Sequence, residues 1–478
     1  MTGGPTPRPA GTDGRNLPLP PYAKGGAPLL GHAWNLVRDP LRFVAGLRDS
    51  GDVVRLRLGP AAAYAVCAPE LVAALLKSPD YEVGGPLWDT MELLIGKGVA
   101  TSNGPLHRRQ RRMIQPAFRP ERIADHAPVM AEEAAAMADR WSPGATVDIG
   151  DEVFRTAVRI VTRSLLHVDS IDERVDRLGG SLHTVFGGLY RRMILSAGPF
   201  WKLPLPAHRR FEGALADLHR LVDEIVMERR MSGTDRGDLL SALLRAKDEN
   251  GETLNEQEVH DQTVSLLVAG AENVASTLTW TFQLLAEHPE EEDRVRAEVL
   301  SVTGGRPVTF GDLPKLPHTR NVITEAMRVR PAVWILTRRA VADSVLGGYR
   351  IPAGADIVYS PYAMQRDPRA FARHLEFDPD RWLPGPQAGR GRPAMMPFGT
   401  GNRKCPGDHF SIVEMAIVLA TVVPRWSLSR LRETDTAPRI GITLQPRRPK
   451  LRAVPVAWSG RSSPHAPPGP GGPGRRGA

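Results

Sequence analysis

The sequence predicts one large, mainly α-helical domain with a minor β region. Long segments with helical periodicity dominate the chain, the strand patterns are few and grouped, and no internal repeat is visible. The 478 residues are 41% hydrophobic and 24% charged, which is typical of a globular enzyme. We expect the domain to span residues 28–458, between an irregular arm at 1–27 and a disordered Pro/Gly/Arg-rich tail at 459–478.

Helices are predicted where apolar residues recur at intervals of three and four positions. These segments are Asp125–Trp141, Phe211–Arg230, Glu256–Ala286, Asn321–Val329 and Phe410–Val423. Strands are predicted where apolar residues alternate or cluster between Gly and Pro turns. They form two expected pairs, Val54–Leu58 with Ala63–Cys67, and Leu346–Ile351 with Asp356–Tyr359.

The composition also limits the partners and the compartment. A net charge of +9 suits nucleic acid, an anionic surface or an acidic protein, but no nucleic-acid recognition motif is present. Two cysteines, Cys67 and Cys405, are too few for a disulfide framework and favour a reducing cytoplasm. No apolar stretch has the length of a signal peptide or membrane span. We therefore expect a cytoplasmic monomer without a membrane anchor, and an inert thiol at Cys67.

One cysteine lies in a loop that is suited to hold a metal. The segment 397–407 reads PFGTGNRKCPG, and its glycines allow the backbone to approach a flat ligand closely. Backbone N–H groups and the start of the following helix are expected to lower the pKa of the Cys405 thiol. A lone cysteine suits a metal that four other atoms already hold, as in haem. A buried structural cysteine in a Gly-rich turn is the alternative.

This loop resembles the haem-binding signature of the cytochrome P450 family, Phe-x-x-Gly-x-Arg-x-Cys-x-Gly. The five fixed positions are matched at Phe398, Gly401, Arg403, Cys405 and Gly407. The resemblance implies the P450 fold, haem b as cofactor with Cys405 as the iron ligand, and haem contacts from Phe398 and Arg403. It also implies O2 and a small apolar substrate, with electrons from a separate ferredoxin and ferredoxin reductase.

Further stretches match the family in the expected order. Glu325 and Arg328, followed by Arg381 in the segment 377–382, imply an ion-pair network that is structural and not catalytic. His107, Arg111 and Arg338 match contacts to the haem propionates, although basic residues on a solvated helix face are the alternative. A basic surface for docking an acidic ferredoxin is expected from the remaining cations, Arg108, Arg109, Arg112 and Lys404.

The segment 269–277 resembles the family's distal helix pattern, Ala-Gly-x-Asp/Glu-Thr. The match implies that Gly270 lets the helix open for dioxygen and that Glu272 helps to deliver protons. Asn273 stands where the family has threonine, and an amide can order a water but does not exchange protons as a hydroxyl does. A water-based relay, a substrate-assisted relay, and isomerase, cyclase or peroxygenase chemistry without external electrons all stay open. Thr277 is expected to be a packing residue.

Three stretches, 104–118, 330–342 and 347–367, resemble the actinobacterial P450s of the albaflavenone monooxygenase type, which oxidise the sesquiterpene epi-isozizaene. This resemblance implies hydroxylation, followed by a second oxidation of the same carbon to a ketone. The walls of the substrate pocket are expected from apolar residues, with core packing as the alternative for each. The candidates are Val83, Leu87, Trp88, Phe186, Leu189, Val268, Ala269, Val333, Trp334, Ile335 and Leu336.

An acidic segment carries a different hypothesis. Asp248, Glu249 and Glu252 faintly resemble the Mg²⁺-binding motif of terpene cyclases, because clustered carboxylates can hold Mg²⁺ around a diphosphate. A bifunctional P450 with weak terpene synthase activity would use them in this way. The alternative is a solvated turn between two helices.

Overall fold

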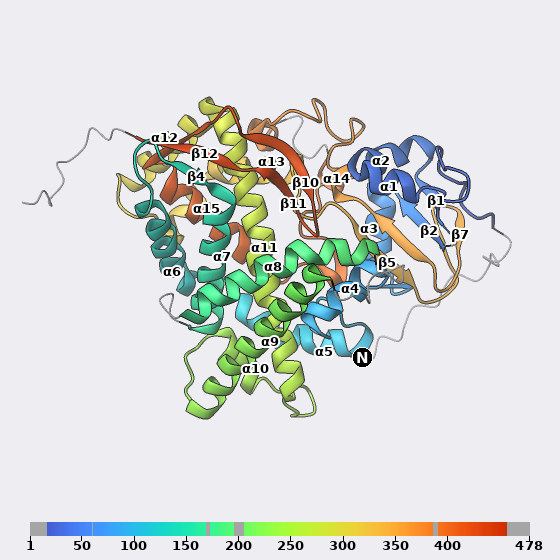
Figure 1. The fold of residues 1–478 in the computed structure, drawn as a ribbon, viewed down its shortest axis with the longest axis horizontal. Helices are drawn as coiled ribbons and strands as arrows, with labels where there is room; N and C mark the ends of the chain where they lie inside the picture. Colours follow the sequence, from blue (N-terminus) through green and yellow to red (C-terminus); the bar gives the residue numbers. More distant parts are fainter. Residues whose placement is uncertain (1–16, 60, 169–172, 196–204, 386–390, 457–478) are drawn as a thin grey trace, which may run out of the picture.

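The computed structural model describes residues 17–59, 61–168, 173–195, 205–385 and 391–456 (Figure 1). The helices are α1 (Ala33–Arg38), α2 (Pro40–Gly46), α3 (Pro69–Lys77), α4 (Pro86–Ile95), α5 (Gly104–Ile114), α6 (Pro120–Asp139), α7 (Ile149–Leu166), α8 (Glu173–Leu195), α9 (Pro206–Ser232), α10 (Leu239–Arg245), α11 (Glu256–Glu287), α12 (Pro289–Thr303), α13 (Pro317–Val329), α14 (Pro361–Met364) and α15 (Asp408–Val422). The strands are β1 (Val53–Leu58), β2 (Ala61–Val66), β3 (Tyr81–Glu82), β4 (Thr146–Asp148), β5 (Leu336–Ala340), β6 (Ser344–Leu346), β7 (Tyr349–Ile351), β8 (Asp356–Tyr359), β9 (Trp426–Arg430), β10 (Asp435–Ile440), β11 (Leu444–Arg448) and β12 (Lys450–Pro455).

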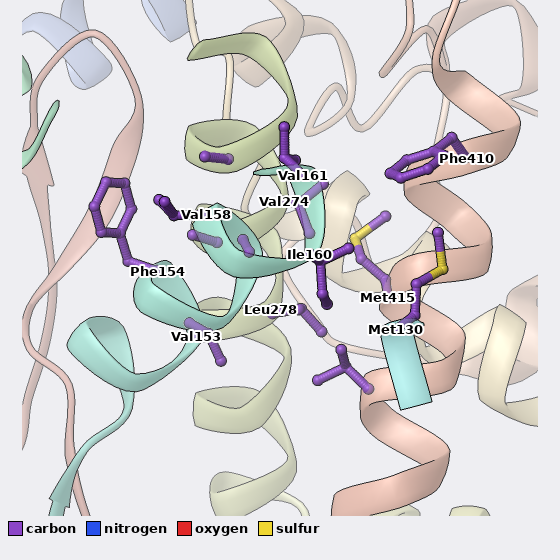
Figure 2. Close-up of a cluster of buried hydrophobic side chains, with 14 of the residues drawn as sticks. Met130, Val153, Phe154, Val158, Ile160, Val161, Val274, Leu278, Phe410 and Met415 are labelled. Carbon is purple, nitrogen blue, oxygen red and sulfur yellow. The ribbon is translucent and has the colours of Figure 1, made fainter. Parts of the chain in front are cut away.

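The long helix α11 runs through the middle of the helical region (Figure 1). It begins with a capping box, in which Asn255 and Glu258 each bond the other's backbone N–H. Nearly all of its middle is buried, so its sequence lacks a broad polar face. Figure 2 shows Val274 and Leu278 of α11 packed between residues of α7 and of α15. The cysteine loop immediately precedes α15, and this packing therefore fixes the loop relative to α11.

Gly270 is required by this packing. A Cβ atom at that position would lie 2.8 Å from Cγ2 of Val161 on α7, closer than side chains tolerate. The helix is unbroken from Glu256 to Glu287. The expectation that Gly270 opens the helix is therefore wrong for this structure, and the glycine brings two helices close together.

The main sheet has the strand order β1-β2-β8-β5-β3, with β2 and β8 parallel and the other neighbours antiparallel. The predicted pairing of Leu346–Ile351 with Asp356–Tyr359 is wrong. Gly347 and Gly348 have φ of 58° and 81°, which makes a tight turn, so that β6 pairs with β7 as a hairpin. The segment Asp356–Tyr359 instead lies between β2 and β5.

The predicted fold class, mainly α with a minor β region, is confirmed. The arm 1–27 is described from residue 17, where Tyr22 forms a parallel bridge with Arg55, while residues 1–16 and the tail 459–478 lie outside the described residues. Within the described ranges, every helix is too short or too polar to cross a membrane.

Candidate functional site

Cys405 lies in a tight loop before α15. Its backbone N–H donates to the Phe398 carbonyl at 2.9 Å, and the N–H of Gly407 points at its sulfur. Burial nevertheless raises the pKa of the Cys405 thiol, against the smaller lowering by Gly407 and Arg111. The predicted lowering is therefore wrong for the thiol alone, because desolvation outweighs the loop's dipoles. A bound cation would supply the stabilisation that the thiolate lacks.

The second cysteine differs in chemistry. Burial, followed by the nearby Asp52 carboxylate, raises the pKa of Cys67 to about 12. Such a thiol is not ionised at neutral pH, which supports the expectation that Cys67 is inert.

A largely apolar cavity connects the Cys405 loop with α11. One face of the helix supplies Ala269, Gly270 and Asn273, and the opposite wall comes from the cysteine loop. The sheet and the segments before α4 and after α13 close the sides. The predicted site residues that line this cavity are Val83, Trp88, His107, Arg111, Ala269, Asn273, Val333, Leu336, Arg338, Phe398, Arg403 and Cys405.

Three guanidinium groups, those of Arg111, Arg338 and Arg403, reach the cavity, and no carboxylate lies among its described lining residues. Burial, followed by the charges of Arg338 and Arg111 among others, lowers the pKa of Arg403 to about 10. Arg403 also donates to Asn103 Oδ1 at 2.5 Å, and Arg111 to the Lys404 carbonyl at 2.5 Å. These buried positive charges need an anionic partner, and a ligand with two carboxylates suits them.

His107 lies on the same side of the cavity, on α5. Burial, and then the charge of Arg403, lower its pKa to about 4, so the imidazole is neutral at pH 7. A neutral imidazole can donate one hydrogen bond to a carboxylate. The donor set, together with a cysteine at the wall, fits the haem that the sequence predicts.

The structural ion pairs join α13 to the segment 378–382. Glu325 and Arg328 on α13 have no exposed side-chain surface, and their nearest charged atoms are 2.8 Å apart. Arg381 Nε lies 3.3 Å from the same carboxylate, and Trp382 Nε1 donates to it at 3.0 Å. The three residues that the sequence grouped are therefore brought together, outside the cavity lining.

Glu272 and Asn273 are adjacent in sequence but point to different partners. Asn273 lines the cavity, and its Nδ2 lies 3.4 Å from the Ala269 carbonyl. Glu272 is not among the lining residues; its Oε1 accepts a hydrogen bond from Thr443 in the turn between β10 and β11. Burial raises the pKa of Glu272, and the bond from Thr443 opposes that shift. The carboxyl group, with its pKa raised by burial, thus lies one residue from the cavity wall.

Several predicted pocket residues belong to the core instead. Trp334 is buried, its Nε1 donates to the Gly441 carbonyl at 3.0 Å, and it is not among the residues that line the cavity. Phe186 packs edge-on against Phe154. The predicted residues that do not line the cavity are Leu87, Phe186, Leu189, Val268, Trp334 and Ile335. Leu87 is buried, and the other five pack in the hydrophobic core.

Other lining residues escaped the sequence prediction. Ser265 and Leu266 lie one helical turn before Ala269, Val274 lies one turn after Gly270, and Thr277 lies one turn after Asn273. The 3.6-residue period, applied outwards from the motif, would have found them. Thr277 therefore lines the cavity, although its hydroxyl also donates to the Asn273 carbonyl at 2.9 Å, as a packing residue would.

The predicted basic docking surface is largely neutralised. Arg109 binds Asp248 and Glu258 at 2.7 and 2.6 Å, and Arg112 binds Glu249 at 2.9 Å. Lys404 likewise pairs with Asp408 at 2.5 Å. The expectation that these cations are spare is wrong, whereas Arg108 is exposed.

The acidic segment 248–252 is held by the same arginines. Asp248 Oδ1 also accepts the N–H groups of Asn250 and Glu252, which is the geometry of a polar turn. Among the residues that the structure describes, no cluster of three or more His, Cys, Asp or Glu is placed to hold a metal. These contacts favour the solvated turn over the Mg²⁺ site.

Relatives and solved structures resemble the whole described chain. The Cytochrome P450 family model matches residues 20–453. "Cyclooctat-9-en-7-ol 5-monooxygenase" of Streptomyces melanosporofaciens is 44% identical, over 85% of this chain and 89% of its own length. "Cyclooctatin synthase" of the same organism is 42% identical (88% and 93%), and "Pentalenene oxygenase" of Streptomyces avermitilis is 40% identical (90% and 96%).

The heme domain of cytochrome P450DA superimposes with a TM-score of 0.83 at 25% identity, covering 92% of this chain and 98% of that structure. The retinoic acid-bound cyanobacterial CYP120A1 has a TM-score of 0.81 at 24% identity, with coverage of 92% and 100%. The chain belongs to the cytochrome P450 family and is a monooxygenase whose cofactor is a cysteine-ligated haem.

Proposed function

We propose that this monooxygenase hydroxylates a small cyclic terpene, with epi-isozizaene as the first candidate. The observation that carries the proposal is the largely apolar cavity that joins the Cys405 loop to the Ala269–Asn273 face of α11. Walls from Val83, Val333 and Leu336 would hold a hydrocarbon by shape. A second oxidation of the same carbon, to a ketone, is part of the proposal.

Each part of the cavity has a role in this proposal. Cys405 would ligate the haem iron, Phe398 would contact the haem, and four groups would bind the propionates: His107, Arg111, Arg338 and Arg403. When bound there, haem activates dioxygen, and thiolate ligation favours O–O cleavage. Cys405 and Asn273 both line this cavity, on the cysteine loop and on α11.

In the same proposal, residues of α11 deliver the protons that the reaction consumes. Burial raises the pKa of Glu272, which favours the protonated carboxyl group, and this group would pass protons towards the cavity. Asn273 donates its amide hydrogens into the cavity and orders a water that completes the path from Glu272. Glu272 must exchange its bond with Thr443 for one with that water.

The substrate class is supported by the relatives, two of which are named for oxidation of cyclooctat-9-en-7-ol and of pentalenene. Electrons come from a separate ferredoxin and ferredoxin reductase, with the exposed Arg108 on α5 as one docking contact. The enzyme works as a cytoplasmic monomer with a catalytic domain at 28–458.

Substrate-binding spectra test this proposal. The purified haem-loaded enzyme is titrated with epi-isozizaene, pentalenene and cyclooctat-9-en-7-ol, and the haem spin state is recorded. A shift with epi-isozizaene, followed by alcohol and ketone products with ferredoxin, reductase and NADPH, is the expected result. A shift with another terpene alone would replace the candidate substrate, and no shift with any of them would contradict the terpene class.

A second candidate function rests on Asn273, which replaces the alcohol of the usual proton path. It is peroxygenase, isomerase or cyclase chemistry that needs no external electrons. Product formation that persists after ferredoxin, reductase and NADPH are omitted would favour it, with peroxide added in a parallel assay. Strict dependence on the electron-transfer proteins would exclude it.

A further inference from the structure

Asn103, the residue before α5, joins the cysteine loop to one wall of the main cavity, the cavity between that loop and α11. Its Nδ2 donates to the Val83 carbonyl at 2.7 Å, and its Oδ1 accepts from the Val83 N–H at 3.1 Å. The same Oδ1 accepts from Arg403 Nη2 at 2.5 Å. Val83 and Arg403 line the cavity, and Asn103 is not among its described lining residues. One side chain outside the cavity therefore connects two parts of its wall.

The bonds between Asn103 and Val83 replace a missing strand. Val83 directly follows β3, which is an edge strand of the main sheet, and its side chain is buried. The Asn103 amide both accepts from and donates to the Val83 backbone, as a residue of a neighbouring strand would. These partners also fix the orientation of the amide, because Oδ1 can only accept and Nδ2 can only donate. The backbone of Val83 is thus satisfied where the sheet ends.

The bond to Asn103 also sets how Arg403 is presented to the cavity. Arg403 Nη2 donates to Asn103 Oδ1, and Arg403 Nη1 lies 3.5 Å from the Val99 carbonyl oxygen. A guanidinium carries five N–H groups in one rigid plane, so two contacts fix the plane and leave the other N–H groups for a carboxylate. The amide of Asn103 is uncharged. It therefore orients Arg403 without neutralising the positive charge that a propionate needs.

We propose that Asn103 is a positioning residue, which orients Arg403 towards a haem propionate and, through Val83, fixes one wall of the substrate site relative to the haem. The proposal rests on the proposed roles of Arg403 and of the main cavity. Both functions come from one amide, so removing the Asn103 side chain weakens haem binding and loosens the wall together.

A second connection joins another cavity arginine to the same wall. Arg338 Nη1 donates to the Thr337 carbonyl at 2.8 Å, and this carbonyl also accepts from Trp88 Nε1 at 3.1 Å. Thr337 Oγ1 donates to the Gly84 carbonyl at 2.7 Å. None of these bonds involves Asn103. Removing the Asn103 side chain should therefore loosen the wall without unfolding it.

Hydrogen exchange in the haem-loaded enzyme tests the bond to the wall without any substrate. In Asn103→Ala, the Val83 amide should exchange about three- to tenfold faster, as the loss of one hydrogen bond predicts. Asn103→Asp keeps an oxygen that accepts from the Val83 N–H, so this variant should retain most of the protection. Asn35→Ala is the matched control, because the Asn35 amide also holds a loop, by donating to the Gly25 carbonyl at 2.8 Å. It should leave exchange at Val83 unchanged.

Release of haem to an apo-globin acceptor tests the orientation of Arg403. Asn103→Ala should release haem about three- to tenfold faster than the unaltered enzyme. In an Arg403→Leu background the same substitution should have no further effect on haem release, because no guanidinium is left to orient. It should still speed exchange of the Val83 amide in that background. An equal acceleration of haem release in both backgrounds would overturn the proposal, since a purely structural Asn103 would act in this way.

Binding of epi-isozizaene, measured by the haem spin-state shift, tests the effect on the substrate site. The dissociation constant should rise about three- to tenfold in Asn103→Ala and stay the same in Asn35→Ala. An unchanged dissociation constant in Asn103→Ala would overturn the link between haem and wall. If epi-isozizaene, pentalenene and cyclooctat-9-en-7-ol all fail to shift the spectrum of the unaltered enzyme, the terpene substrate is contradicted. The exchange and haem-release measurements then decide the role of Asn103 by themselves.

Discussion

The Glu325 carboxylate and the Arg328 guanidinium lie 2.8 Å apart, and neither side chain reaches solvent. Removing one partner leaves the other charged and buried, which costs about 3–5 kcal/mol in the free energy of unfolding. Arg328→Met should therefore lose about that amount in urea unfolding followed by circular dichroism. Arg155→Met, at an exposed pair with Asp151, is the control and should change the value by less than about 0.5 kcal/mol. Equal losses would contradict the role of burial.

Removing an arginine side chain from the main cavity should lower the affinity for haem. Arg338 is 6% exposed, and a guanidinium bonded to a carboxylate contributes about 1.5–3 kcal/mol. Arg338→Leu should release haem to an apo-globin acceptor about ten- to a hundredfold faster than the unaltered enzyme. Arg112→Leu removes the same charge from an exposed position on α5 and should release haem at the original rate. An unchanged rate in Arg338→Leu would remove this residue from the propionate contacts.

Glu272 should matter for turnover and not for binding. Glu272→Gln keeps the shape but cannot deliver a proton, so product formation should fall on the order of tenfold to a hundredfold or more, while the substrate spin-state shift persists. Thr443→Val removes a bond that lowers the pKa of Glu272, so that pKa should rise further. The pH profile of turnover measures this change. A profile identical to that of the unaltered enzyme would show that the Thr443 bond does not tune the acid.

The role of Asn273 can be tested by restoring the threonine that the family usually has at this position. Asn273→Thr supplies the hydroxyl that the family usually has, and should increase the fraction of NADPH consumption that ends in product. Asn273→Ala removes the amide without a replacement and should lower that fraction. Measuring product and peroxide per NADPH separates the two effects. If both variants match the unaltered enzyme, the ordered water needs no side chain at this position.

Glu414 on α15 should make the free energy of unfolding depend on pH. Both of its carboxyl oxygens are buried without a hydrogen-bond partner among the described residues, and burial raises its pKa well above the usual value. The folded protein keeps this proton while the unfolded chain loses it above about pH 4.3, so the contribution of Glu414 to stability falls as pH rises. The unfolding free energy of Glu414→Gln, minus that of the unaltered chain, should therefore increase from pH 5 to 8. A constant difference would mean that Glu414 is not protonated in the fold.

The sequence predicted the parts of the site that are local in the chain. The cysteine loop and the pair Glu325 and Arg328 lie within short segments, where spacing alone sets the geometry. The long helix was predicted to within one residue at its end, Ala286 against Glu287, because its capping residue and period are both local signals.

Long-range packing accounts for what the sequence could not predict. Trp334 follows Val333, which does line the cavity, but the Trp334 indole N–H donates to the Gly441 carbonyl. These two residues are 107 positions apart, so no local sequence pattern could predict the contact. The same holds for β8, whose strand pattern was recognised but whose neighbours were not. The thiol pKa of Cys405 was misjudged because burial is a tertiary property.

The turn after β10 has a further consequence, for the order in which the protein is made. Its Thr443 bonds Glu272, and the Leu444 carbonyl accepts from Trp280 Nε1 and Ser276 Oγ on α11. The ribosome releases these partners more than 160 residues after the helix that they complete. At about 5–20 residues added per second, roughly 10–30 s pass between the synthesis of α11 and that of Thr443, the partner of Glu272. These contacts to α11 can therefore form only after nearly the whole polypeptide has been synthesised.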